Sequence, residues 1–213
     1  MAVPGPSSAR GCAVSGRRRL SAEAAELAPS RDPARSVARI RAATLGSPEQ
    51  EAARERVLAL LAVAGEAAAD RTTAPGHLTG SALVVDPSTG AVLVLLHTKL
   101  RRWLQPGGHA DGDHELAGVA LREATEETGI DGLEVLVPAV DLDVHTVDHG
   151  DALGEHLHLD LRFVVVAPPG AEAPGNHEST DRRWVTLDEL EQLADEPGLV
   201  RLARAGLAAL EED

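Results

Sequence analysis

From residue 77 onward the chain alternates apolar segments of strand length with helical segments, and this alternation limits the possible folds most. Strand-like runs occupy residues 78–85, 91–96, 132–138, 141–147 and 156–166. Residues 115–128 have the spacing of a helix that ends at Gly129. Strands interspersed with helices favour an α/β sandwich built around a mixed sheet.

The core of such a sandwich has to be aliphatic. The chain has 213 residues, of which 43% are hydrophobic, but it contains one Phe, two Trp and no Tyr. A domain of this size buries roughly 70% of its unfolded surface, so a core can form. The shortage of aromatic side chains argues against a single-stranded nucleic-acid platform. No run of 18 apolar residues occurs, so no membrane span or membrane partner is expected.

The segment before residue 77 has a different texture. Its first part is rich in Pro, Gly, Ser, Ala and Arg without periodicity, which is typical of disorder. Further on, Ser47 followed by Pro48 is a helix-start signal, and Gly65 can end that helix. The expected division is a disordered tail at 1–32, a helical extension at 33–66, a linker at 67–76 and the main domain at 77–213.

The charge is strongly acidic and unevenly spread. The net charge is −14, with about +5 in residues 1–47 and about −19 in the remainder. An acidic body repels phosphate backbones, so duplex nucleic acid is not an expected partner. The single cysteine, Cys12, excludes an internal disulfide and fits a reducing compartment. No apolar leader follows the basic N-terminal residues, so we expect a cytoplasmic protein.

Three glutamates share one face near the end of the expected helix. Glu123, Glu126 and Glu127 are spaced three and four residues apart. Like charges at this spacing cost roughly 0.2–0.5 kcal/mol per pair, and the helix dipole also disfavours them there. A solvated acidic face is the ordinary explanation of such a cluster. A divalent cation would reverse the repulsion, and hard carboxylate oxygens suit Mg²⁺ or Mn²⁺.

The residues around these glutamates carry a specific resemblance. The pattern Gly108-x5-His114-x7-Arg122-Glu123-Ala124-x-Glu126-Glu127-x-Gly129-Ile130 resembles the Nudix box, G-x5-E-x7-R-E-U-x-E-E-x-G-U. The spacing is intact over residues 108–130, with His114 in place of the first Glu and a small Ala at one hydrophobic position. The resemblance to the Nudix hydrolase family implies an α/β/α sandwich with a mixed sheet, here preceded by the helical extension.

The same resemblance implies roles for individual residues. The implied metal ligands are the carboxylates of Glu123, Glu126 and Glu127 and a backbone carbonyl of Gly107 or Gly108. Glu123 or Glu127 would help to deprotonate the attacking water, and Arg122 would hold a glutamate in position. The implied cofactor is Mg²⁺ or Mn²⁺. Glu115 follows His114 directly but would need a local shift to replace the missing carboxylate.

Other residues are candidates for substrate binding, each with an ordinary structural alternative. The candidates are His109 beside the box, Glu178 in a later loop, and Trp103, for which packing is the favoured role. Strand alternation also places His156, His158 and Asp160 on one face. That face could hold a metal or phosphate, but we favour a polar outer face of a half-buried strand.

The resemblance to the Nudix family implies a metal-dependent hydrolase that cleaves the pyrophosphate bond of a nucleoside diphosphate linked to another moiety. The alternative is a non-catalytic nucleotide-binding or sensing module, for which His114 is the support. An isomerase acting on an isoprenoid diphosphate is disfavoured, because that chemistry relies on a cysteine and Cys12 lies in the expected tail. The sequence fixes neither the substrate nor the oligomeric state, and a homodimer is compatible with it.

Overall fold

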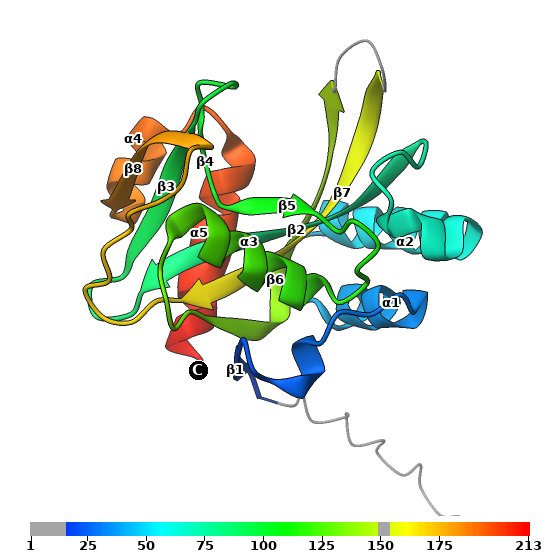
Figure 1. The fold of residues 1–213 in the computed structure, drawn as a ribbon, viewed down its shortest axis with the longest axis horizontal. Coiled ribbons are helices and arrows are strands. Elements are labelled where there is room, and N and C mark those ends of the chain that lie inside the picture. The colour runs from blue at the N-terminus through cyan, green and yellow to red at the C-terminus, as the bar shows by residue number, and fades with distance from the viewer. Residues whose placement is uncertain (1–15, 149–153) are drawn as a thin grey trace, which may run out of the picture.

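The computed structural model describes residues 16–148 and 154–213, and its architecture is a mixed sheet between two layers of helices (Figure 1). The helices of this part of the chain are η1 (Ala25–Leu27), α1 (Pro33–Ala42), α2 (Pro48–Ala64), η2 (Gly65–Ala69), α3 (Leu116–Thr128), α4 (Leu187–Leu193) and α5 (Pro197–Glu211). The strands are β1 (Arg18–Ser21), β2 (Gly76–Asp86), β3 (Ala91–His97), β4 (Trp103–Leu104), β5 (Gly107–His109), β6 (Glu134–Asp148), β7 (Glu155–Val166) and β8 (Ser179–Val185). The predicted α/β/α class is confirmed.

Strand β2 organises the sheet. The strands follow the order β1-β6-β7-β2-β3-β4, while β5 pairs with β2 and β8 pairs with β3. The long β2–β7 ladder is parallel, and the other pairings are antiparallel. On its other edge β2 pairs with β5 over residues 79–81 and with β3 over residues 84–86. One strand therefore positions both the short β5 and the main body of the sheet.

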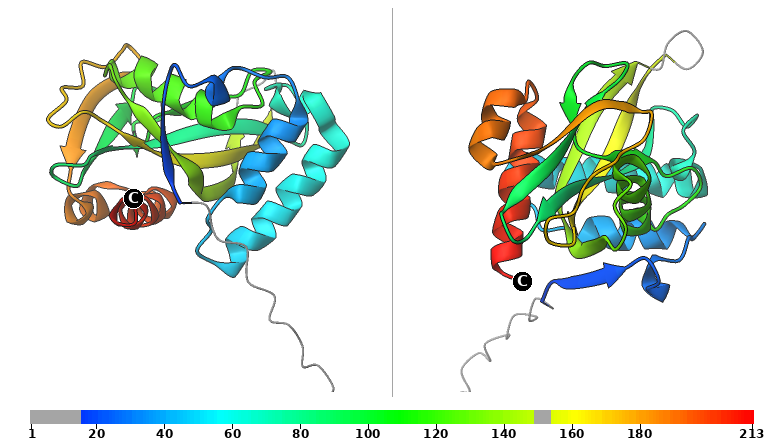
Figure 2. Two further views of the ribbon diagram at one scale, coloured as in Figure 1. Left: turned by 90° about the horizontal axis from the view of Figure 1, so that it is seen from below. Right: turned by 60° about the vertical axis from the view of Figure 1, so that its left-hand side comes forward.

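Each face of the sheet has its own apolar core. One core joins the sheet to α1, α2 and α3 and contains Phe163, which is fully buried. The second core joins the other face to α4 and α5 through Leu190 and Leu202. The left view of Figure 2 shows α3 and α5 on opposite sides of the sheet. In the described part of the chain no helix combines the length and apolarity needed to cross a membrane.

The expected disorder of residues 1–32 is wrong for residues 16–32, while residues 1–15 lie outside the described part. Strand β1 pairs in antiparallel fashion with residues 134–137 of β6. Leu20 and Leu27 are buried in the core that α3 shares. The segment was misjudged because four strand residues with a single buried leucine produce no detectable periodicity.

The helical extension forms as α1 and α2, with Ser47 capping α2 by accepting a hydrogen bond from the backbone N–H of Gln50. Part of the expected linker is structured, because η2 buries Ala68 and Ala69. The two strands expected at 132–138 and 141–147 are one strand, β6, whose register with β7 shifts between Leu136 and Asp141. The interruption contains a proline, which cannot donate to the ladder.

The polar face of β7 is not an outer face, contrary to the favoured interpretation. His156, Asp160 and Arg162 are all buried. Asp160 accepts hydrogen bonds from the hydroxyls of Thr79 and Ser81 at 2.9 Å and from Nε of Arg162 at 2.6 Å. Alternation correctly grouped these residues, but only the neighbouring strands show that the face is covered.

The order of residues 16–32 can be tested by truncating a buried leucine. Leu27→Ala should lower the free energy of unfolding by about 2 kcal/mol, and hence the melting temperature by roughly 4–8 °C, because it leaves a cavity beside α3. Val63→Ala on the exposed face of α2 is the control, since that side chain is 90% exposed and should change little. Equal melting temperatures of both variants would show that the N-terminal segment does not pack.

Candidate active site

Strand β5 brings two glycines against the acidic end of α3. A Cβ atom on Gly108 would lie 2.4 Å from Oε2 of Glu123, so no larger residue fits without displacing that carboxylate. The backbone N–H of Gly107 donates a hydrogen bond of 3.3 Å to Oε2 of Glu127. Glycine allows this close approach because it lacks a side chain. The loop and the helix therefore form one continuous site.

The three glutamates differ in exposure. Glu123 and Glu127 are half-buried, with 21% of the Glu123 side chain exposed, whereas Glu126 is exposed. Glu126 and Arg122 line a shallow hollow of 310 Å³ between α3 and the N-terminal segment. The helix ends at Gly129, which adopts a left-handed conformation with φ of +69°. The residue spacing predicted that the three glutamates share one patch. The structure adds that Glu123 and Glu127 are partly shielded from water, whereas Glu126 is exposed.

Glu178, from the loop before β8, joins this patch. Burial, followed by the nearby Glu178 carboxylate, raises the pKa of Glu127 to about 8, despite the opposing hydrogen bond from Gly107. Burial also raises the pKa of Glu123, with Glu126 and Glu178 adding to the effect and Arg122 opposing it. The sequence suggested Glu178 as a carboxylate facing the box, and the structure brings it there.

The donor set fits a hard divalent cation. Two half-buried carboxyl groups, Glu123 and Glu127, lie with Glu126 and Glu178 beside the glycines of β5. The raised pKa values of Glu123 and Glu127 mean that burial and neighbouring carboxylates disfavour the ionised forms, which a bound cation would favour. The ion pair between Nε of Arg122 and Oε1 of Glu123 is long, at 3.8 Å. Oxygen ligands of this kind are those that Mg²⁺ and Mn²⁺ prefer.

Arg122 is held by a residue that the sequence analysis missed. Asp113, which is buried, accepts hydrogen bonds from Arg122 at 3.4 Å and from the backbone N–H groups of Ser30 and Glu115. An Asp two residues before a helix start is a recognisable turn signal, since its side chain can accept from the backbone two residues on. That signal could have identified Asp113 as the residue that positions the box.

His114 faces the N-terminal extension. Its ring is fully buried, with Nδ1 2.9 Å from the hydroxyl of Ser36 and Nε2 3.1 Å from the carbonyl oxygen of Glu66. The neighbouring Glu115 is 1% exposed and forms ion pairs of 2.7 and 2.6 Å with Arg35 and Arg39 of α1. Both residues therefore fasten the start of α3 to the extension.

The other two candidates for substrate binding, Trp103 and His109, lie beside side chains other than the glutamates. The Trp103 ring packs beside the core of α4 and α5, with the guanidinium of Arg183 4.8 Å from its centroid. The His109 ring lies 5.1 Å from the rings of His77 and His158.

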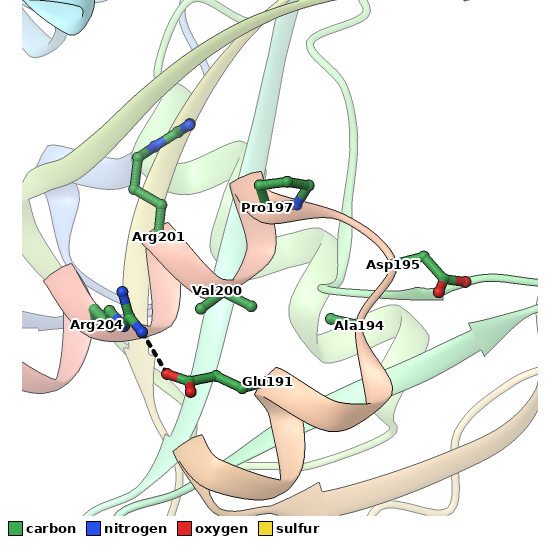
Figure 3. Close-up of a pocket in the computed structure, with 7 residues that line it drawn as sticks. All are labelled: Glu191, Ala194, Asp195, Pro197, Val200, Arg201 and Arg204. Atoms are coloured by element: carbon green, nitrogen blue, oxygen red, sulfur yellow. Dashed lines mark hydrogen bonds and ion pairs between the residues drawn. The ribbon is translucent and has the colours of Figure 1, made fainter.

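A separate hollow of 480 Å³ between α4 and α5 is lined by the residues of the Arg204–Glu191 ion pair, as Figure 3 shows.

The NUDIX domain pattern matches this chain over residues 76–205, which is more than half of its length. The chain therefore belongs to the NUDIX family and is a Nudix-type hydrolase. The match begins at β2 and leaves the N-terminal extension outside it. No curated protein sequence matches the chain.

Several solved structures are similar to this chain at low identity. The E. coli dihydroneopterin triphosphate pyrophosphohydrolase is 15% identical with a TM-score of 0.51, over 60% of this chain and 92% of that chain. A C. elegans Ap4A hydrolase is 18% identical with a TM-score of 0.45, over 60% and 93%. A NUDIX-family hydrolase from Clostridium perfringens is 21% identical with a TM-score of 0.46, over 63% and 96%.

Glu127→Gln should stabilise the metal-free protein, increasingly so at higher pH. The folded-state pKa of about 8 lies above the value of the unfolded chain. As pH rises from about 4.5 to about 8, the folded state retains a proton that the unfolded state has lost, so wild-type stability falls. Glutamine is uncharged at every pH and escapes this loss.

Melting curves recorded with a chelator at about pH 5, 7 and 9 test this expectation, the variant's gain being largest at the highest pH. Each kcal/mol of relieved destabilisation corresponds to about 2–4 °C. The exposed Glu172→Gln serves as the control. A gain that is the same at every pH would contradict the burial of an ionised Glu127.

His114→Glu tests the structural role of His114. The change restores the box pattern but replaces a ring held by Ser36 and the Glu66 carbonyl with a carboxylate beside buried Glu115. A buried group that loses its partners costs about 1–3 kcal/mol, and more when charged, so the melting temperature should fall by several degrees. His177→Glu, at an exposed position, is the control. An unchanged melting temperature would refute this role.

Proposed function

We propose that this protein hydrolyses the pyrophosphate bond of a nucleoside diphosphate linked to another moiety, with Mg²⁺ or Mn²⁺ as its cofactor. The observation that carries the proposal is the convergence of Glu123, Glu127 and Glu178 on the backbone of β5. A protein of similar fold is a dihydroneopterin triphosphate pyrophosphohydrolase, and a pyrophosphate bond is the bond that this proposal takes as cleaved.

The proposed metal ligands are Glu123, Glu126 and Glu127, with the carbonyl of Gly107 and the carboxylate of Glu178 close by. When bound, Mg²⁺ would neutralise phosphate charge, polarise the scissile P–O bond and lower the pKa of a coordinated water. The acidic body of the protein makes such neutralisation necessary for any phosphorylated substrate.

The remaining chemistry belongs to the chain. Glu127, whose ionised form a bound cation would favour, accepts the proton of the attacking water, and the N–H of Gly107 fixes the orientation of its carboxylate. The water oxygen forms a new bond to one phosphorus, and the bridging oxygen leaves with the other phosphate. Arg122, anchored by Asp113, positions Glu123. This scheme needs no covalent nucleophile.

A sensing module without catalysis is the alternative, and it depended on His114. Because His114 and Glu115 are engaged with the N-terminal extension, the change at this position leaves the grouping of Glu123, Glu127 and Glu178 intact. This separation supports the hydrolase over the sensor.

Hydrolysis can be tested with a panel of nucleoside diphosphate conjugates and nucleoside triphosphates, with and without Mg²⁺. Mass analysis of products formed in ¹⁸O-labelled water identifies the bond cleaved and the phosphorus attacked. We expect a nucleoside monophosphate and a phosphorylated second product, formed only with a divalent metal. Nucleotide binding without turnover on the whole panel would favour the sensor.

Glu127→Gln should reduce turnover by at least about 100-fold, because it removes one preorganised charged group from the site. The matched control is Glu172→Gln, an exposed loop residue at which turnover should not change. Both variants are compared at saturating Mg²⁺ with their folding verified by circular dichroism. Near wild-type turnover of Glu127→Gln would exclude its proposed role as the base.

A further inference from the structure

A second cluster of potential ligands lies outside the acidic patch and consists of histidines. Among the residues that the structure describes, five imidazole rings gather at one end of the sheet, with neighbouring centroids 4.7–5.8 Å apart. They are His77, His109, His145, His156 and His158, contributed by β2, β5, β6 and β7. The proposed hydrolysis uses none of them.

Strand register produces this gathering. His77 of β2 stands opposite His158 of the parallel strand β7, and His158 also stands opposite His145 of β6. His109 of β5 stands opposite Thr79, two residues beyond His77 on the same face of β2. The rings therefore rest on paired strands rather than on loops, which is the rigid support that a metal site needs.

Nδ1 of His145 lies 2.9 Å from a carboxylate oxygen of Asp143, and Nδ1 of His156 lies 3.2 Å from the carbonyl oxygen of Gly154. Three of the five rings, His77, His109 and His158, each place one ring nitrogen within 4.8 Å of those of the other two. Because of this convergence of nitrogens, those three form the candidate ligand set.

A buried carboxylate on the same strand belongs to a different network. Asp160, two residues along β7 from His158, is fully engaged by Thr79, Ser81 and Arg162. Imidazole nitrogen is the commonest protein ligand for metal ions. In a tetrahedral Zn²⁺ site the ligand nitrogens lie about 3.3 Å from one another. Small rotations of the three rings would bring their nitrogens to this separation.

We propose that His77, His109 and His158 bind a borderline divalent transition-metal ion, with Zn²⁺ as the representative. Three nitrogen ligands with an open fourth position are a recurring zinc arrangement. His77 is fully buried, whereas His109 and His158 are partly exposed, so the ion can enter from their side. Nitrogen-only ligands distinguish this site from the oxygen ligands of the acidic patch, which suit Mg²⁺.

The two sites lie on opposite faces of β5. Gly108 faces Glu123, and successive residues of a strand face opposite sides, so the adjacent His109 faces His77. An ion held by the three histidines would join β5 to β2 and β7. It would thereby fix the strand that carries Gly107 and Gly108 against the acidic end of α3.

The test is Zn²⁺ titration of the full chain, without a histidine tag and stripped by a chelator, in excess Mg²⁺ to occupy the acidic patch. Calorimetry should give one Zn²⁺ per chain, and Co²⁺ should give the visible absorption of a four-coordinate site. Loss of even an outer-shell partner weakens metal sites 10–100-fold, so His109→Ala and His158→Ala should each weaken binding at least about 100-fold.

Two controls make the result specific. His177→Ala removes an exposed histidine outside the cluster, and Glu127→Gln alters the acidic patch, so both should bind Zn²⁺ as the wild type does. If His158→Ala does not fold, His109→Ala on the three-residue strand β5 provides the same test. The proposal is overturned if the wild type binds no Zn²⁺ in excess Mg²⁺, or if folded His109→Ala binds it equally well.

Discussion

The short pairing of β5 with β2 is the contact on which both candidate sites depend. Three residue pairs, from Ser81–Gly107 to Thr79–His109, join these strands. They place Gly107 and Gly108 under the carboxylates of α3 and leave His109 on the other face. A shift of one residue would exchange the two faces and remove both arrangements. Gly107 and Gly108 can approach the carboxylates of α3 closely because they lack side chains. The pairing of β5 with β2 holds them in that position.

A buried network of ion pairs links β6, β7 and α5. Arg162 of β7 is 5% exposed and contacts Asp141, Asp143 and Asp160, while Arg201 of α5 contacts Asp141 and Asp143. Hydrogen bonds and ion pairs offset the cost of removing these charges from water, and losing one partner would leave another charge unpaired. The network thus ties β6, β7 and α5 together beside the histidine cluster, whose member His145 also contacts Asp143.

The segments that precede β2, including the helical extension, support the loop before α3. The backbone N–H of His114 donates a hydrogen bond of 2.6 Å to the carbonyl oxygen of Ser30, and that of Gly112 donates one of 2.9 Å to the carbonyl oxygen of Ala69. Together with the pairs that Glu115 forms with α1, these bonds hold the loop that leads into α3. The extension therefore takes over the support of the helix start at the position where the box departs from its pattern, and it leaves the glutamates at the other end of α3 undisturbed.

The sequence by itself determined the local features. The spacing of Glu123, Glu126 and Glu127 depends only on helix geometry, and the stop at Gly129 depends on its conformational freedom, so both were predicted correctly. The class of fold and the family followed from the same local patterns. The pairing of β1, the burial of His114 and the coverage of the polar face of β7 were not predicted.

Those features depend on partners far away in the chain, such as Ser36 for His114, 78 residues away, and Thr79 for Asp160, 81 residues away. Ser36 approaches His114 only because α1 packs beside α3, and His77 meets His158 only because β2 and β7 pair in parallel. Short-range periodicity contains no information about which strand lies next to another or what covers a face. The sequence therefore determined the helix that carries the glutamates, whereas tertiary packing alone decided which histidines converge and what role His114 has.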